Sequence, residues 1–219
     1  MDAITRIIVW LPQLLAGAKT TIIITILSVS IGLVLSLFLA LGKMAKNPII
    51  SAPCRAYIFF FRGTPLLMQI YFFYFGLPQF HPALTIQSAF VAAMIAFTLN
   101  TAAYLAENIR AGLESIDIGQ HEAAKALGMS YSQTMKLVII PQTVRRLIPP
   151  VGNEFIMVLK DVSLVAIIGL SDLTKVTRAI SSSSATALVY IPAMIIYLII
   201  TAFFTFVFNK AEKKYGSYE

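Results

Sequence analysis

Charged side chains interrupt residues 147–170, an otherwise apolar stretch long enough to cross a bilayer. Two of them, Glu154 and Asp161, are seven residues apart, which places both on one face of an α-helix, about 10 Å apart along its axis. An ionised group at membrane depth is unfavourable unless it is paired or faces a polar cavity. Two acids on one face therefore predict a site for a cationic side chain.

Two neighbours of Asp161 can belong to the same site. Lys160 lies on a different helix face and can contact the carboxylate of a ligand or form an ion pair with a nearby acid. Ser163 follows in the same LKDVSL segment. The alternative is a structural ion cluster that locks helix packing, and the sequence leaves it open for Glu154 as well.

A second polar face is predicted within residues 82–106 and just beyond. Asn100, Tyr104 and Glu107 recur at i, i+4 and i+7, with Asn100 deepest in the apolar block. Asn100 can bind a ligand or support helix packing through an interhelical hydrogen bond. Tyr104 can contact a ligand or pack as an ordinary aromatic residue.

The sequence gives no support for an enzyme. His81 and His121 fall on opposite sides of the predicted membrane, Cys54 is the single cysteine, and no nucleophile elbow or H-E-x-x-H motif occurs. We therefore expect no catalytic residue, no metal site and no cofactor in this chain. The phosphate-binding G-x-x-x-x-G-K-[ST] loop is also missing, so a partner chain would have to hydrolyse any ATP.

Composition indicates an integral membrane protein that forms one domain over residues 1–219. Hydrophobic residues make up 58% of the chain and charged residues 12%, with a mean hydropathy of +0.81. The net charge of +7 is spread over short loops, which argues against nucleic-acid binding. We expect membrane lipid to surround the chain instead.

Five blocks are long enough to span a bilayer, which predicts an all-α fold. Residues 1–12 precede them and are expected to form a separate helix at the membrane interface. Thr64 and Pro65 can open the backbone near the start of the second block. The five blocks are residues 20–42, 57–79, 82–106, 147–170 and 187–208.

The distribution of basic residues predicts the orientation. Twelve Lys and Arg residues fall in the segments after the first, third and fifth blocks, and four fall on the other side. The positive-inside rule therefore places the N-terminus outside, the loop of residues 110–146 and the C-terminus in the cytoplasm, and the serine run 181–184 in an outer loop.

Within that loop, residues 122–141 read EAAKALGMSYSQTMKLVIIP. Glu122, Ala123 and Ala124 favour helix, Gly128 favours a turn, and a second helical stretch is expected to end before Pro141. The spacing of these residues resembles the EAA loop of bacterial ATP-binding-cassette (ABC) importer permeases. Three other segments, FRGTPLLMQ (61–69), NTAAYLAENIRAG (100–112) and LKDVSLVAIIG (159–169), resemble the polar amino-acid branch of that family.

The resemblance implies a type I importer fold, in which Glu122, Ala123, Ala124 and Gly128 belong to a coupling helix that docks on the ATPase. It also implies an ATPase dimer that holds ATP and Mg²⁺, a second permease copy or homologue, and an extracellular or periplasmic binding protein. The acid at Glu154 departs from the commoner neutral residue of the family. We therefore expect an importer of basic amino acids that works by alternating access, and keep a gradient-driven secondary transporter as the alternative.

Overall fold

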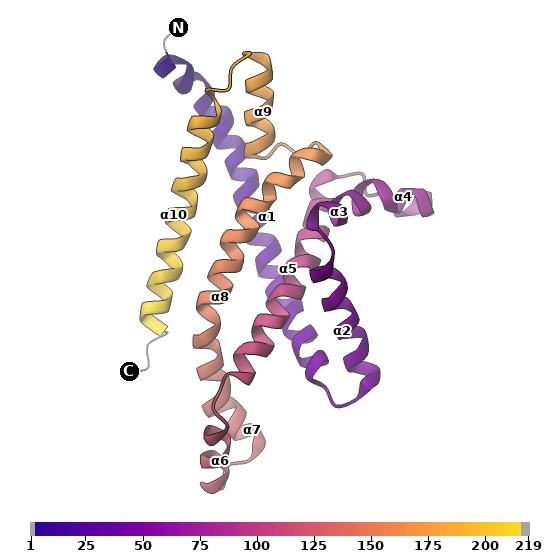
Figure 1. Ribbon diagram of the computed structural model, residues 1–219, viewed down its shortest axis with the longest axis vertical. Coiled ribbons are helices and arrows are strands. Elements are labelled where there is room, and N and C mark those ends of the chain that lie inside the picture. Colours follow the sequence, from indigo (N-terminus) through magenta and orange to yellow (C-terminus); the bar gives the residue numbers. More distant parts are fainter. Residues whose placement is uncertain (1–2, 216–219) are drawn as a thin grey trace.

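The computed structural model describes residues 3–215, and every regular element in this range is helical. Four long helices, α1, α5, α8 and α10, run along the long axis, while α6 and α7 lie at one end and α9 at the other (Figure 1). The segment α3–α4 projects sideways from the bundle (Figure 1). The helices are α1 (Ala3–Met44), α2 (Pro48–Gly63), α3 (Leu66–Tyr71), α4 (Leu77–Phe80), α5 (Ala89–Glu114), α6 (Ile118–Ala126), α7 (Tyr131–Thr134), α8 (Ile140–Asp161), α9 (Leu173–Ser183) and α10 (Tyr190–Tyr215).

The predicted all-α membrane architecture is confirmed. Among the described residues, α1, α5 and α10 are each long and apolar enough to cross a membrane, and α2 with the segment Leu66–Phe80 makes a fourth span if the bent pair counts as one. Helix α8 occupies the fourth predicted block but lies outside that set. It carries Glu154, Lys160 and Asp161, so its composition is less apolar than that of the other long helices.

The prediction of a separate interfacial helix at residues 1–12 is wrong for the residues described. Helix α1 runs without a break through Pro12. Trp10 and Leu14, 8% and 0% exposed, pack in one cluster with Leu173 and Ile180 of α9. These contacts extend the first helix beyond the apolar block, because they give its first turns a buried face.

The second predicted block is not one continuous helix. Helix α2 begins at Pro48, with the Asn47 side chain accepting a hydrogen bond from the Ile49 amide (2.9 Å), and ends at Gly63. The axis then bends by 104° before the segment Leu66–Phe80 continues. Pro65 causes the break, because it cannot donate a helical hydrogen bond.

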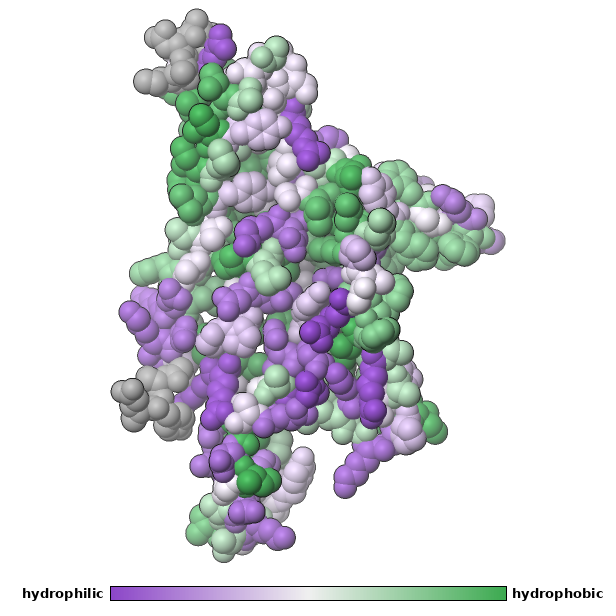
Figure 2. All heavy atoms as spheres, in the orientation of Figure 1, coloured by the Kyte–Doolittle hydropathy of each residue, from purple (hydrophilic) through white to green (hydrophobic). Residues whose placement is uncertain are grey.

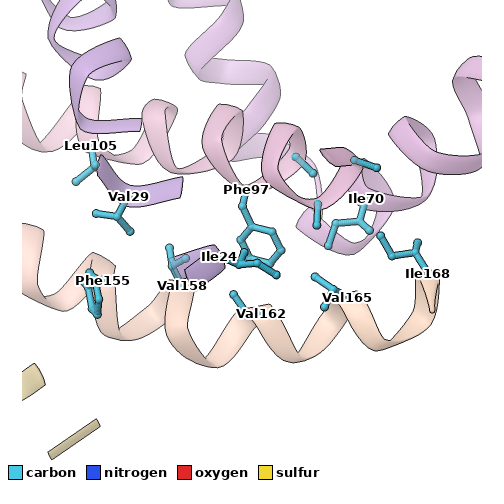
Figure 3. Packing of buried hydrophobic residues seen from close by; sticks show 13 residues of the cluster. Ile24, Val29, Ile70, Phe97, Leu105, Phe155, Val158, Val162, Val165 and Ile168 are labelled. Carbon is cyan, nitrogen blue, oxygen red and sulfur yellow. The ribbon is translucent and has the colours of Figure 1, made fainter. Parts of the chain in front are cut away.

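Close packing of α1 on α5 forms the centre of the bundle. Small polar residues allow this approach on α1, where the Thr25 hydroxyl donates to the Thr21 carbonyl oxygen (2.9 Å) and so satisfies its own hydrogen bond within the helix. Beside them, Ile24 and Phe97 are fully buried against Val162, the first residue of the 3₁₀ helix after α8 (Figure 3). This core fixes α5 relative to α8.

The serine run does not form an open loop. Ser181 to Ser183 are the last residues of α9, a helix that we did not predict, and Ser184 follows as its C-cap. The buried Asp172 side chain caps the start of α9 by accepting from the Thr174 and Lys175 amides, both at 2.9 Å. The start of α9 is also held against α1, because the Leu173 amide donates to Thr21 Oγ1 (3.3 Å).

We expect Gly17→Ala to destabilise the protein by about 1–3 kcal/mol, because overpacking displaces neighbouring backbone. A Cβ atom at Gly17 would lie 2.9 Å from both the Asp172 carbonyl oxygen and the Leu173 Cα atom, which belong to the start of α9. Thermal unfolding in detergent measures the change. Gly63→Ala is the control, since a Cβ there would meet no atom within 4 Å. Equal stability of the two variants would contradict this account of the contact.

Candidate functional site

A cavity of about 360 Å³ lies where the break between α2 and α3 faces α5 and α8. We call this 360 Å³ cavity the central cavity. On the face of the molecule drawn in Figure 2, hydrophilic side chains gather in the lower half. The lining residues of the central cavity are Arg62, Gly63, Thr64, Pro65, Leu66, Asn100, Tyr104, Glu154, Met157, Val158 and Asp161.

The central cavity brings together four of the six predicted binding residues. Glu154, only 8% exposed, and Asp161, which is exposed, reach it from α8, and Asn100 and Tyr104 reach it from α5. Glu154 and Asp161 therefore lie on one face of α8, as their seven-residue spacing predicts.

Two further predicted residues are not among those that line this cavity. Lys160 is exposed, and Ser163 is half-buried in the 3₁₀ helix Val162–Ile168 that follows α8. Lys160 points away because it is next to Asp161, and neighbouring residues on a helix lie about 100° apart around the axis.

Asn100 makes the interhelical contact that the sequence left as an alternative. Its amide donates to the Phe61 carbonyl oxygen (3.0 Å) and to Gln69 Oε1 (3.1 Å). Gln69 in turn donates to backbone and hydroxyl oxygens of the break. Sequence reasoning assigned Gln69 no role, although a glutamine within the apolar run of the FRGTPLLMQ segment was a usable signal.

Arg62, in the same FRGTPLLMQ segment, is a second residue to which the sequence analysis assigned no role in binding. Its guanidinium lies 5.3 Å from the centre of the Tyr104 ring, a cation–π contact, and 4.0 Å from Glu107 Oε2. Tyr104 therefore holds a cation at the wall of the cavity that Glu154 and Asp161 also line.

Glu107 belongs to an ion cluster rather than to the lining of the central cavity. It pairs with Lys43 of α1 at 2.6 Å and with Arg110 at 2.5 Å, and Arg110 also pairs with Glu114. With Arg62, five charged groups are linked by these contacts, and the cluster ties α1 to α5.

At the end of the molecule where α6 and α7 lie, the predicted helix, turn and helix are present. Gly128 has a φ of +76°, and the Met129 and Gly128 amides donate to the carbonyl oxygens of Ala124 (3.1 Å) and Lys125 (3.0 Å). This Schellman pattern ends α6. Ser130 and Gln133 then form a capping box that starts α7. Glu122 and Ala123 are exposed on α6, whereas Ala124 is buried.

The predicted end of the second helix before Pro141 is wrong. The chain passes from α7 through a π-helical turn, Met135–Ile139, directly into α8, and the Ile140 amide donates to the Met135 carbonyl oxygen. The π turn ends directly before Pro141, which has no amide hydrogen to donate back to the preceding turn.

Residues 32–216 match the family described as "Binding-protein-dependent transport system inner membrane component". The chain belongs to this family.

Relatives in the family share much of the sequence over nearly their whole length. The L-cystine transport system permease protein TcyL of Bacillus subtilis is 38% identical, with 94% of this chain and 88% of the relative covered. The arginine transport system permease protein ArtQ of Bacillus subtilis is 38% identical, with 94% of each chain covered. The glutamine transport system permease protein GlnP of Escherichia coli K12 is 36% identical, with 93% of each covered.

Solved structures agree with this assignment. A crystal structure of an amino acid ABC transporter with histidines has a TM-score of 0.91 at 38% identity, over 98% of this chain and 99% of that chain. The MetNI methionine transporter in an inward-facing conformation shares the fold, with a TM-score of 0.77 at 18% identity, over 92% and 95% of the two chains.

The chain is therefore an inner-membrane permease subunit of an amino-acid ABC importer. Such permeases are not themselves enzymes, and a separate subunit is the ATPase. Membership of the family also implies a substrate-binding protein. The relatives named above carry cystine, arginine and glutamine in their names, so the family alone does not choose a substrate.

Proposed function

We propose that this permease imports basic amino acids such as arginine, lysine or histidine. The observation that carries the proposal is the pair of acids, Glu154 and Asp161, on the wall of the central cavity. Glu154 is largely buried, so a guanidinium or ammonium group that enters would offset its poor solvation through charge-assisted hydrogen bonds. Neutral side chains cannot do so.

The same cavity also offers a positive charge for the carboxylate of an amino acid. Among the residues that the structure describes along this cavity, Arg62 is the one with a positive charge. An α-carboxylate would pair with its planar guanidinium, which matches carboxylates in a bidentate way. We therefore propose Arg62 as the carboxylate contact, a role for which the sequence alone suggested Lys160 or Asn100.

Competition in reconstituted vesicles tests the substrate class. The permease, its ATPase and the binding protein would be incorporated together, and ATP-dependent uptake of labelled arginine would be measured with unlabelled lysine, histidine, glutamine or cystine as competitors. We expect lysine and histidine to compete better than the neutral amino acids. Equal competition by glutamine would refute the basic class while leaving the importer assignment intact.

We further propose that the segment 122–128 docks on the ATPase, which would hold ATP and Mg²⁺ as a dimer below two permease copies or homologues. The exposed apolar residues around it support a protein contact, since Leu127 is 82% exposed and Tyr131 is 77% exposed. Hydrolysis would drive alternating access of the central cavity. A gradient-driven carrier is not retained, because the relatives are ABC permeases.

The proposed orientation places α6 and α7 in the cytoplasm and α9 outside, at opposite ends of the molecule (Figure 1). Ser182 is exposed on α9 and suits a topology test. We expect Ser182→Cys, in a background where Cys54 is replaced by serine, to react with a membrane-impermeant maleimide in intact cells. A cysteine at Gln133, exposed on α7, is the matched control and should react only after permeabilisation. The reverse pattern would overturn the orientation.

A further inference from the structure

The break between α2 and α3 leaves a carbonyl group without its helical partner. In an α-helix the carbonyl of residue i accepts from the amide of residue i+4, and for Phe61 that residue is Pro65, which has no amide hydrogen. Phe61 is itself only 8% exposed. An unpaired carbonyl in such surroundings is strongly unfavourable, so another donor has to replace the missing one.

Two buried amide side chains supply the donors. Gln69 Nε2 donates to the Phe61 carbonyl oxygen (3.0 Å), the Thr64 carbonyl oxygen (3.1 Å) and Thr64 Oγ1 (2.8 Å). Asn100 Nδ2 donates to the same Phe61 oxygen (3.0 Å) and to Gln69 Oε1 (3.1 Å). Gln69 is 4% exposed and Asn100 is 8% exposed, so water competes little for these bonds.

The backbone held in this way is one wall of the central cavity. Arg62 and the four residues that follow it line the cavity, and the bonds from Gln69 fix the backbone on either side of Arg62. Gln69 itself is not among the lining residues. The separation between this wall and the acids of α8 therefore depends on an amide that does not reach the cavity.

We infer that Gln69, joined to Asn100, is a positioning residue that sets the substrate affinity of the central cavity by holding the break in α2–α3. The inference rests on the proposed function, in which the cavity binds an amino acid. Gln69 would affect substrate recognition without touching the substrate, because its side chain holds the backbone that forms one wall of the cavity. A purely structural role would instead change how much protein folds.

The test is Gln69→Met in the complete complex with its ATPase, because methionine keeps the length of the side chain and removes its donors. Equilibrium binding of labelled arginine gives both the dissociation constant and the number of sites. We expect the affinity to fall by about tenfold or more. Gln79→Met is the matched control, because the exposed Gln79 amide donates to Phe75 in the same projecting segment and lies outside the cavity. Its affinity should stay unchanged.

The number of sites separates positioning from folding. Loss of folded protein lowers the number of sites without changing their affinity, so an unchanged dissociation constant in Gln69→Met would overturn the inference. If that variant does not assemble, Gln69→Asn decides, because it keeps the amide group, shortens its reach to the Phe61 and Thr64 oxygens and changes no residue that lines the cavity. We then expect a smaller loss of affinity, and wild-type affinity would overturn the inference.

The test of the positioning role of Gln69 does not depend on which class of amino acid the cavity binds. Labelled glutamine would be measured beside arginine on wild type and variants. If wild type binds glutamine and not arginine, the proposed basic class fails, and the effect of Gln69→Met on glutamine affinity still tests the positioning role.

Discussion

Arginine affinity is expected to fall about thirtyfold or more when Glu154 is replaced by glutamine. The carboxylate is 8% exposed and lines the central cavity, so a bound guanidinium would lose a charged partner in surroundings that water screens poorly. Truncating one partner of a buried, hydrogen-bonded charge pair costs about 2–5 kcal/mol. Equilibrium binding of labelled arginine and glutamine to the complete complex measures the change, and the relative preference should move towards glutamine.

The control for this variant is Glu114→Gln on α5. Glu114 pairs with Arg110 in the ion cluster, is more exposed than Glu154, and lies outside the cavity. Glu114→Gln removes one negative charge, as Glu154→Gln does, so a general effect of net charge would appear in both variants. Unchanged arginine affinity in Glu154→Gln would show that this acid serves helix packing.

Gly128→Val is expected to reduce ATP-driven uptake at least about tenfold while arginine binding and membrane insertion persist. The φ of +76° is strained for a β-branched residue by roughly 1–3 kcal/mol. A Cβ there would meet no atom within 4 Å, so the backbone conformation alone is perturbed. Relaxation of that strain would break the Schellman bonds and redirect α6 relative to α7. Uptake and arginine-stimulated ATP hydrolysis measure the loss.

Gly128→Asn provides the graded control, because asparagine visits the left-handed region far more readily than valine. We expect it to retain most of the uptake. Normal coupling in Gly128→Val, or equal loss in both variants, would count against the role of this turn.

The sequence predicted those features that depend on local chemistry. Gly128 is the residue type that a left-handed helix end requires, and the seven-residue spacing of Glu154 and Asp161 follows from helix geometry alone. The long apolar blocks likewise predicted membrane helices, because hydrophobic length is a property of each segment by itself.

The partners in distant contacts were not predicted. The sequence indicated an opening of the backbone at Thr64 and Pro65 and offered an interhelical hydrogen bond for Asn100, but no local pattern identifies its acceptor, the Phe61 carbonyl oxygen 39 residues away. The serine run 181–184 was taken for a loop and α9 was not predicted, although Asp172 as a cap followed by Leu173, Thr177 and Ile180 on one face was a usable helical signal.

The uninterrupted run from α7 through the π turn into α8 has a mechanical consequence. Tyr131 is the first residue of this helical segment and lies close in sequence to the turn at Gly128. Glu154 is 23 residues further along, a distance of about 35 Å in a straight helix. One continuous helical segment, which includes Pro149 and Pro150, therefore carries both the surface proposed to meet the ATPase and the acid proposed to hold the substrate. No loop separates the two ends of this segment. A displacement of the end at the ATPase would therefore also move Glu154, which would couple the nucleotide state of the ATPase to the affinity of the cavity for the amino acid.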